Sequence, residues 1–188
     1  MTTFSRICIC ICFITLGPFS LSLSKVDPPN TSFTLNRLAP FFPGQKFGAL
    51  QELFGKGKVL NQEGGLQIVR FEISHLRYKF PVMVQIANDR VMDFFAPLPS
   101  YFLHDLFHQS LINRYGPQDS YRRGDGFALY EWKNRQGLSH SYSGACTVTC
   151  FPLYYAVYPA SKPTNFPKYK SIVEKKQDGW TTLKSSKI

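Results

Sequence analysis

The chain has 188 residues, of which 44% are hydrophobic and 18% are charged, and its formal net charge at pH 7 is +10. This composition argues against disorder for most of the chain, because charged residues are sparse and aromatic residues are plentiful. The length permits one domain or two small ones, and a domain of ~150 residues buries roughly 70% of the surface of its unfolded chain.

Residues 1–24 have the pattern of a secretory signal peptide. Arg6 precedes an apolar run at 7–17, and small residues follow before Lys25. Such a run is too short to cross a bilayer, which takes ~20 apolar residues, and its flanks fit a cleaved signal. We therefore expect an exported protein, periplasmic or secreted, that does not span a membrane once mature. Nucleic acid is not an expected partner of such a chain.

The next segments predict an extended leader and then a first α+β unit. Residues 25–43 form the leader, because a residue that precedes proline avoids the helical conformation. Residues 44–98 form the unit, and its short helix has an apolar face. The alternation of apolar residues predicts a strand at 66–73 and another at 78–86. Turn residues and a further apolar run follow the second strand, which predicts a hairpin.

Residues 99–160 show the same order of predicted elements. A helix at 101–115 has an apolar stripe and ends at Gly116 and Pro117, a pair that stops a helix firmly. A strand at 127–134 and a hairpin from Leu138 onward follow. We therefore predict an α+β fold of two tandem helix-plus-antiparallel-sheet repeats of roughly 60 residues, packed together because neither sheet could bury its apolar face alone. The alternative is a coarse likeness between two unrelated α+β segments.

Each predicted helix ends in an aromatic residue followed by glycine. The residues concerned are Gly44, Leu50, Phe54 and Gly55 in the first unit, and Leu103, Leu111, Tyr115, Gly116 and Pro117 in the second. With the strands that follow, this pattern resembles the β-lactamase-inhibitor-like tandem repeats and the BamE/SmpA-type envelope proteins, over residues 42–159. The resemblance implies a non-catalytic, exported protein that binds other proteins through a sheet. The lipidated cysteine of the BamE-type proteins is missing here, and so is the Thr or Ser usual early in their first helix.

One face of the second sheet is a candidate binding surface. Small polar side chains alternate along its long strand, beside apolar residues of the preceding strand and a basic loop, and such mixtures are typical of protein-binding surfaces. The candidate residues are Tyr121, Arg122, Arg123, Phe127, Leu129, Ser139, Ser141, Ser143 and Thr147. An ordinary solvated face is the alternative, because antiparallel sheets commonly have one.

Cysteines and histidines offer a second, chemical interpretation. Cys146 and Cys150 remain after loss of the signal, and on a straight strand their Cα atoms would be ~13 Å apart. A disulfide needs less than about 7 Å, so a bridge requires a turn between them, and two buried free thiols are equally open. His104 and His108 have the i, i+4 spacing of metal ligands on a helix, but spacing alone names no third ligand. We therefore expect ordinary hydrogen bonds for both histidines, and no metal or cofactor.

Residues 161–188 carry seven lysines against Glu174 and Asp178, with little apolar periodicity. They are expected to form a flexible basic tail that is either solvated or in contact with an anionic envelope surface. The whole pattern predicts a non-catalytic binding or envelope-structure module whose partner is another exported or envelope protein. The alternative is a metal-dependent or thiol-dependent hydrolase that uses His104 and His108, or Cys146 and Cys150.

Overall fold

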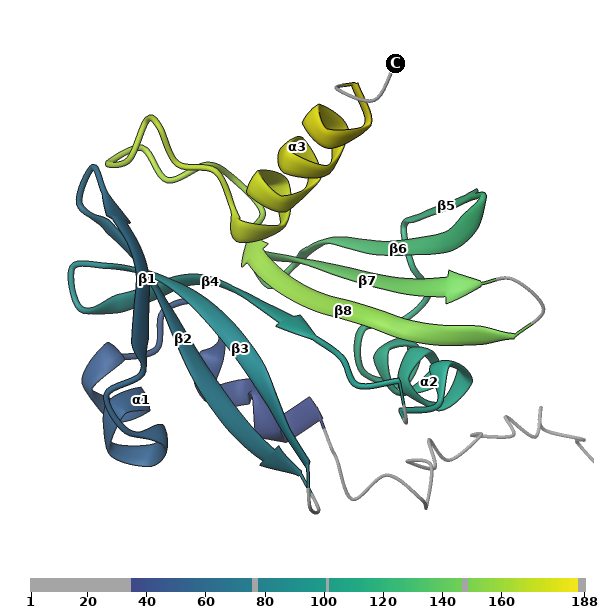
Figure 1. The fold of residues 1–188 in the computed structure, drawn as a ribbon, viewed down its shortest axis with the longest axis horizontal. Coiled ribbons are helices and arrows are strands. Elements are labelled where there is room, and N and C mark those ends of the chain that lie inside the picture. The colour runs from purple at the N-terminus through teal and green to yellow at the C-terminus, as the bar shows by residue number, and fades with distance from the viewer. Residues whose placement is uncertain (1–34, 76–77, 101, 147–148, 186–188) are drawn as a thin grey trace, which may run out of the picture.

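A computed structural model describes residues 35–75, 78–100, 102–146 and 149–185 of the chain (Figure 1). Its strands are β1 (Lys58–Glu63), β2 (Leu66–His75), β3 (Tyr78–Ala87), β4 (Arg90–Pro97), β5 (Ser120–Gly124), β6 (Gly126–Arg135), β7 (Leu138–Cys146) and β8 (Cys150–Pro159). Its helices are the 3₁₀ helix η1 (Leu35–Phe41), α1 (Phe47–Phe54), α2 (His104–Tyr115) and α3 (Ile172–Ser185). No helix among the described residues is long and apolar enough to cross a membrane.

All eight strands belong to one antiparallel sheet with the order β1-β2-β3-β4-β8-β7-β6-β5. Strands β4 and β8 pair at its centre, where Phe94 lies opposite Val157 and Ala96 lies opposite Tyr155. The predicted fold class of two helix-plus-sheet repeats is therefore wrong, because the fold is dominated by a single sheet with few short helices. Edge strands expose unpaired backbone N–H and C=O groups, and pairing β4 with β8 satisfies them within the chain.

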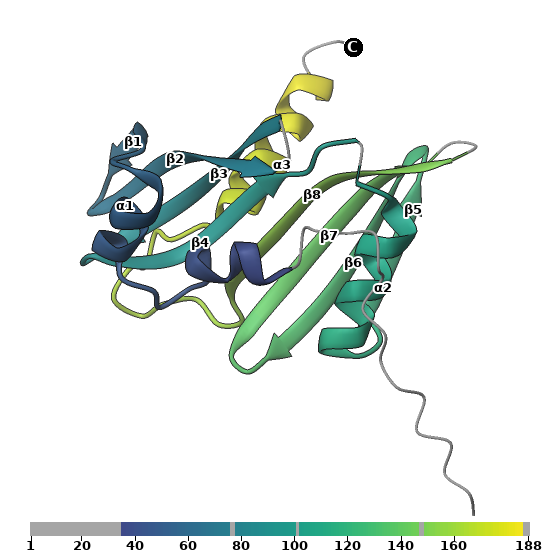
Figure 2. The ribbon, with the colours of Figure 1, turned by 90° about the horizontal axis from the view of Figure 1, so that it is seen from below.

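The helices η1, α1 and α2 cover one side of the sheet, here called the helical face (Figure 2). Apolar residues of the sheet alternate toward this side and form the main core with the helices. The residues buried there include Leu38, Phe41, Leu50, Val84, Phe94, Leu111, Trp132 and Tyr155. The expected leader at 25–43 is corrected in part: three apolar residues at a spacing of three (Leu35, Leu38 and Phe41) are buried in η1, while residues 25–34 lie outside the described residues.

The C-terminal part of the chain crosses the opposite side of the sheet, here called the α3 face (Figure 1). Ile172 and Val173 are buried there against Phe95, Leu129 and other sheet residues. The expectation of a flexible tail over 161–188 is therefore wrong for its described part. Too few apolar residues mark the segment for a periodic pattern, but they match an apolar patch that the sheet already offers.

Candidate functional site

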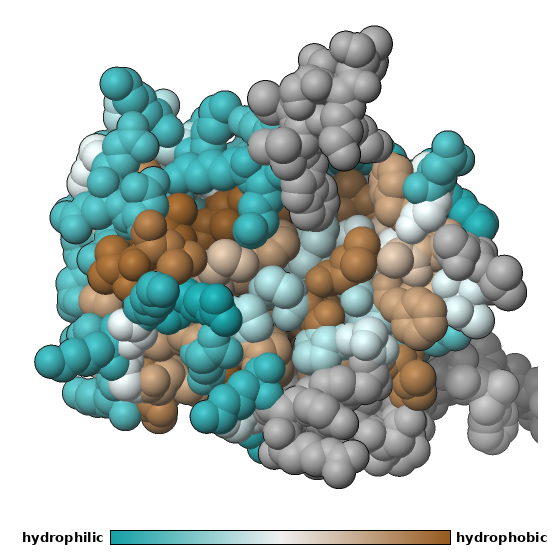
Figure 3. All heavy atoms as spheres, in the orientation of Figure 1, coloured by the Kyte–Doolittle hydropathy of each residue, from teal (hydrophilic) through white to brown (hydrophobic). Residues whose placement is uncertain are grey.

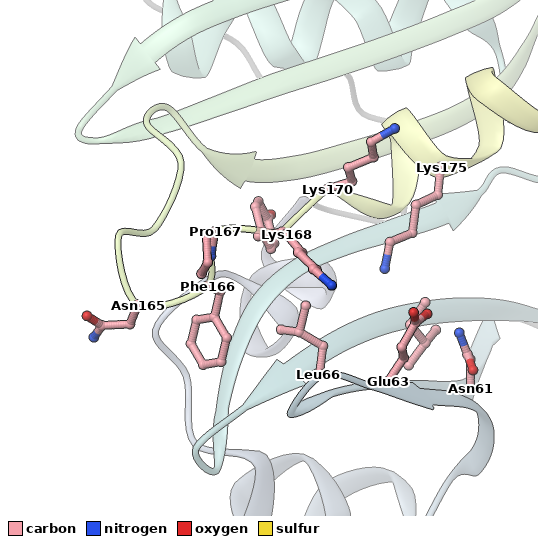
Figure 4. A pocket seen from close by; sticks show the side chains of 12 residues that line it. Asn61, Glu63, Leu66, Asn165, Phe166, Pro167, Lys168, Lys170 and Lys175 are labelled. Atoms are coloured by element: carbon pink, nitrogen blue, oxygen red, sulfur yellow. The ribbon is translucent and has the colours of Figure 1, made fainter.

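The α3 face carries an open cavity of about 570 Å³ (Figure 4). One wall is the β1–β2 hairpin, and the other is formed by residues 165–170 with Lys175 of α3. Its apolar lining comes from Leu66, Ile68 and Phe166. In the half of the molecule that contains β1, β2 and β3, apolar surface lies next to hydrophilic surface (Figure 3). Concave apolar sites with a few convergent polar groups are the usual form of a ligand site.

Lysine is the main charged residue type around this cavity, with Lys168, Lys170 and Lys175 against Glu63. Lys168 and Lys175 extend into the space above Leu66 and Glu63 (Figure 4). Lys170 instead pairs with Asp178 at 2.8 Å. Among the described residues, Lys168 has no hydrogen-bond or ion-pair partner. The cavity, hereafter the lysine cavity, therefore presents positive charge to an incoming ligand.

Lys175 is held in place by a buried polar network. Its Nζ donates to Oε1 of Gln85 at 2.7 Å, and Gln85 donates from Nε2 to the carbonyl of Lys170 at 3.3 Å. Next to Gln85 on the same face lies Asp93, which is 1% exposed. The hydroxyl of Tyr169 donates to Asp93 at 2.7 Å, and the backbone N–H of Ile172 donates to its other oxygen at 3.1 Å. These bonds fasten the segment that forms the cavity wall to the sheet.

The carboxyl group of Asp93 has an unusual affinity for its proton. Burial raises the pKa of Asp93 to about 7, against the opposing effects of the Tyr169 hydrogen bond, the Ile172 backbone hydrogen bond and the charge of Lys175, while the charge of Glu174 raises the pKa further. Asp93 therefore changes charge near neutral pH, in direct contact with the segment that carries the lysines.

The predicted binding surface is divided between the two sides of the sheet. Arg122 pairs in register with Leu129, and both lie on the α3 face. Tyr121 lies on the helical face, where its ring packs 5.0 Å from that of Tyr130, and Arg123 shares this side because it is two residues further along β5. The basic loop expected at 121–126 is largely strand β5.

The serines of the predicted surface are buried. Ser139 is 7% exposed, Ser141 is 1% exposed and Ser143 is 4% exposed, and Leu129 is also buried. Phe127 remains 42% exposed. It lies in register with Ala145 of β7, and Ala145 in turn lies in register with the exposed Phe151 of β8. Thr147 lies outside the described residues. Of this set, Tyr121, Arg122, Arg123 and Phe127 are accessible to a partner.

Of the histidine and cysteine candidates, His104, Cys146 and Cys150 lie together at the start of α2, and His108 lies one turn further along the helix. Cys146 and Cys150 lie in register on β7 and β8 and form a disulfide, with 4.1 Å between their Cα atoms, which is within the limit of about 7 Å for a bridge. Neither sulfur is a thiolate nucleophile in this state. The rings of His104 and His108 are stacked with 5.9 Å between their centroids, and burial lowers the pKa of both. The remaining described histidine with a placed ring, His140, is hydrogen-bonded to Tyr155 at 2.7 Å.

The sequence patterns missed the lysine cavity and Asp93. Lys168 and Lys170 lie in a segment that was expected to be flexible, so their shared site could not be foreseen. Asp93 did give a signal, because it is a single carboxylate inside the apolar run of β4. A charged residue in such a position is rarely buried without a partner.

Comparisons with known proteins assign no family to this chain. No family model matches the sequence, and no curated protein matches it. Among solved structures, a cysteine-rich secretory protein from Staphylococcus aureus is similar, with a TM-score of 0.40 and 10% sequence identity. The match covers 65% of this chain and 46% of that chain, so this chain spans less than half the length of that protein. The function of the chain is therefore inferred from its own residues.

Proposed function

We propose that the protein is an exported, non-catalytic binding module, and that it holds an extended acidic segment of another exported protein at the lysine cavity. The single observation that carries this proposal is the pairing of an apolar lining with two lysines that extend into the same cavity. A carboxylate in the cavity would approach Lys168 and Lys175, and its apolar neighbours would approach Leu66 and Phe166. Opposite charges at an interface favour encounter and fix the register of the partner.

The neighbouring edge of the sheet supports an extended ligand. Strand β1 contributes Asn61 and Glu63 to the cavity and pairs with β2 alone among the described strands. All six of its residues are exposed, including Val59 at 52% and Leu60 at 46%. An extended segment can add to such an edge by backbone hydrogen bonds, while alternate side chains enter a pocket. This geometry favours a peptide over a flat lipid surface, which cannot reach into a recess.

Binding can be measured with a fluorescent peptide of alternating valine and glutamate residues. We expect Lys168→Glu to weaken its binding to the mature protein about tenfold, which corresponds to roughly 1.4 kcal/mol for one attractive pair turned repulsive. Lys133→Glu changes the net charge equally at an exposed site on β6 and is expected to leave the affinity within about twofold. Binding should also weaken as salt is raised, since Lys168 is exposed to solvent and Lys175 is only half-buried.

Two outcomes would contradict this proposal. Equal losses for the Lys168 and Lys133 variants would show that the peptide senses net charge alone. The second outcome is that the protein binds vesicles of anionic lipid and does not bind the peptide. If Lys168→Glu abolished that vesicle binding, the partner would be an envelope surface. As a control, a peptide of alternating valine and lysine should not bind the native protein.

Export is the other half of the proposal, and it rests on the signal-peptide pattern at 1–24. We expect the mature chain to start at Leu23 or Lys25, because small residues precede both positions. Amino-terminal sequencing of the protein recovered outside the cytoplasm checks this. A chain that begins at Met1 would contradict it.

A further inference from the structure

Three side chains that can bind a metal converge where the first turn of α2 meets the closed end of the β7–β8 hairpin. One ring nitrogen of His104 and the sulfur atoms of Cys146 and Cys150 all lie within 4.8 Å of one another. Gly144 permits this approach, because a Cβ atom at that position would lie 2.7 Å from Nδ1 of His104. The cluster is on the helical face, so it is separate from the lysine cavity.

His104 is prepared to act as a ligand. Histidine binds a metal as the neutral imidazole, through a ring nitrogen that carries no proton. The hydroxyl of Tyr142 is hydrogen-bonded to Nδ1 at 2.8 Å, and the hydroxyl of Tyr130 lies 3.5 Å from Nε2. Whichever nitrogen binds a metal, the other keeps a tyrosine as a partner. Such outer partners orient the histidines of metal sites.

We propose that reduction of the Cys146–Cys150 disulfide converts this cluster into a Zn²⁺ site with two thiolates, one imidazole and a water molecule as ligands. A small dithiol or a dithiol oxidoreductase supplies the electrons: its two thiols form a disulfide, the protein sulfur–sulfur bond breaks, and each cysteine gains a proton. Zinc binding then releases these two protons to solvent, while His104 binds in its neutral form. Reoxidation of the cysteines by a disulfide reverses the sequence and expels the metal.

The geometry of the cluster suits zinc. With Zn–S distances of about 2.3 Å and Zn–N distances of about 2.0–2.1 Å, the ligand atoms of a tetrahedral site lie roughly 3.5–3.8 Å apart. The three atoms here are within 4.8 Å of one another, so on reduction the two sulfurs need only separate from bonding distance to about 3.8 Å while the histidine nitrogen stays close to both. In the oxidised protein the sulfurs are bonded to each other and offer no thiolate. Two cysteines and one histidine also leave the fourth position open, as in the zinc sites that bind water.

Cobalt titration tests this site, because thiolate-bound Co²⁺ has a charge-transfer band in the near ultraviolet and strong visible bands when tetrahedral. The full mature protein is reduced, freed of reductant without oxygen and titrated with Co²⁺ and then Zn²⁺. We expect one metal per chain in the reduced protein and none in the oxidised protein. His104→Gln should weaken binding at least about tenfold, the scale on which even outer partners of a metal site act.

His108→Gln is the matched control, because His108 lies one turn further along α2 and is outside the three-ligand cluster. It should bind cobalt as the unmodified protein does, and near-ultraviolet circular dichroism should show that both variants are folded. Equal losses for the two histidine variants would overturn the proposal, as would thiolate bands that persist in His104→Gln. A reduced protein that is unfolded both with and without metal would also overturn it.

Discussion

Removal of residues 161–188 is expected to destabilise the protein by on the order of 5 kcal/mol, which is a large part of the 5–15 kcal/mol that stabilises a typical domain. Tyr169, Ile172 and Val173 are each less than 5% exposed. Burial of an apolar or aromatic side chain contributes roughly 1.5–3 kcal/mol, and the sheet residues beneath them would also meet water. A loss of 1 kcal/mol lowers the melting temperature of a domain of this size by about 2–4 °C or more. We therefore expect a melting temperature lower by at least about 10 °C, or no cooperative transition.

Point variants identify the cause of this loss. Ile172→Ala combined with Val173→Ala should reproduce much of the effect, because it removes the buried contacts and keeps the chain length. Lys170→Ala is the control, because it changes an exposed residue of the same segment. Binding of a hydrophobic dye should rise in the truncated protein as Phe95 and Leu129 become exposed. A truncated chain that melts like the full one would show that the segment only rests on the sheet.

Local structure was predictable because neighbouring residues encode it. The alternation along β3 predicts the side chains on one side of the strand, and Phe80, Val82, Val84 and Ile86 are all buried on the helical face. The turn after β3 is equally local. Asn88 and Asp89 have φ values of +49° and +58°, as asparagine and aspartate permit in tight hairpin turns.

The pairing of distant strands was not predictable from these patterns. A period of two tells which side chains share a face, but it does not tell which strand lies alongside. Strand β4 could equally have been an edge of a small sheet, and its sequence would have been the same. Its pairing with β8 depends on backbone groups that every residue other than proline carries.

Polar residues on a strand also misled the prediction of the exposed face. Ser141 was expected on an accessible face of the sheet, yet it is 1% exposed, and Gln85 on the same side is fully buried. Their burial follows from the chain segment and helix that lie over the α3 face. The binding surface that we propose therefore lies at the lysine cavity, where the lysines of that segment are exposed, and not at the buried serines of β7.

Replacement of Asp93 by asparagine is expected to change the difference in unfolding free energy between the variant and the native protein by on the order of 4 kcal/mol between about pH 4 and pH 8. The change favours the variant as pH rises. The pKa of Asp93 is raised from 3.8 to about 7 in the folded protein. Between these values the folded state holds a proton that the unfolded state has released. Stability from this group is therefore complete at low pH and is lost as pH rises to about 7, and each pKa unit corresponds to about 1.36 kcal/mol.

The difference between the pH profiles of unfolding free energy of the native protein and the Asp93→Asn variant separates the effect of Asp93 from that of the histidines. Burial lowers the pKa of His140 to about 4, and it lowers the pKa of His104 and His108 as well. Buried neutral histidines make the protein more stable as pH rises from the lowered pKa of the folded state to about 6.5, which is the opposite sign. Both proteins contain them, so their effect cancels in the difference between the two unfolding free energies.

Urea unfolding of both proteins across this pH range gives the difference directly. The asparagine side chain can accept the Ile172 hydrogen bond through Oδ1 and donate to the Tyr169 hydroxyl through Nδ2, so the variant should fold and should gain on the native protein as pH rises. Tyr169→Phe removes a hydrogen bond that lowers the pKa of Asp93, so it should move the titration of this carboxyl above pH 7. Parallel profiles for the native protein and the Asp93→Asn variant would mean that Asp93 is already ionised at pH 4, held by its two hydrogen bonds and Lys175 against the cost of burial.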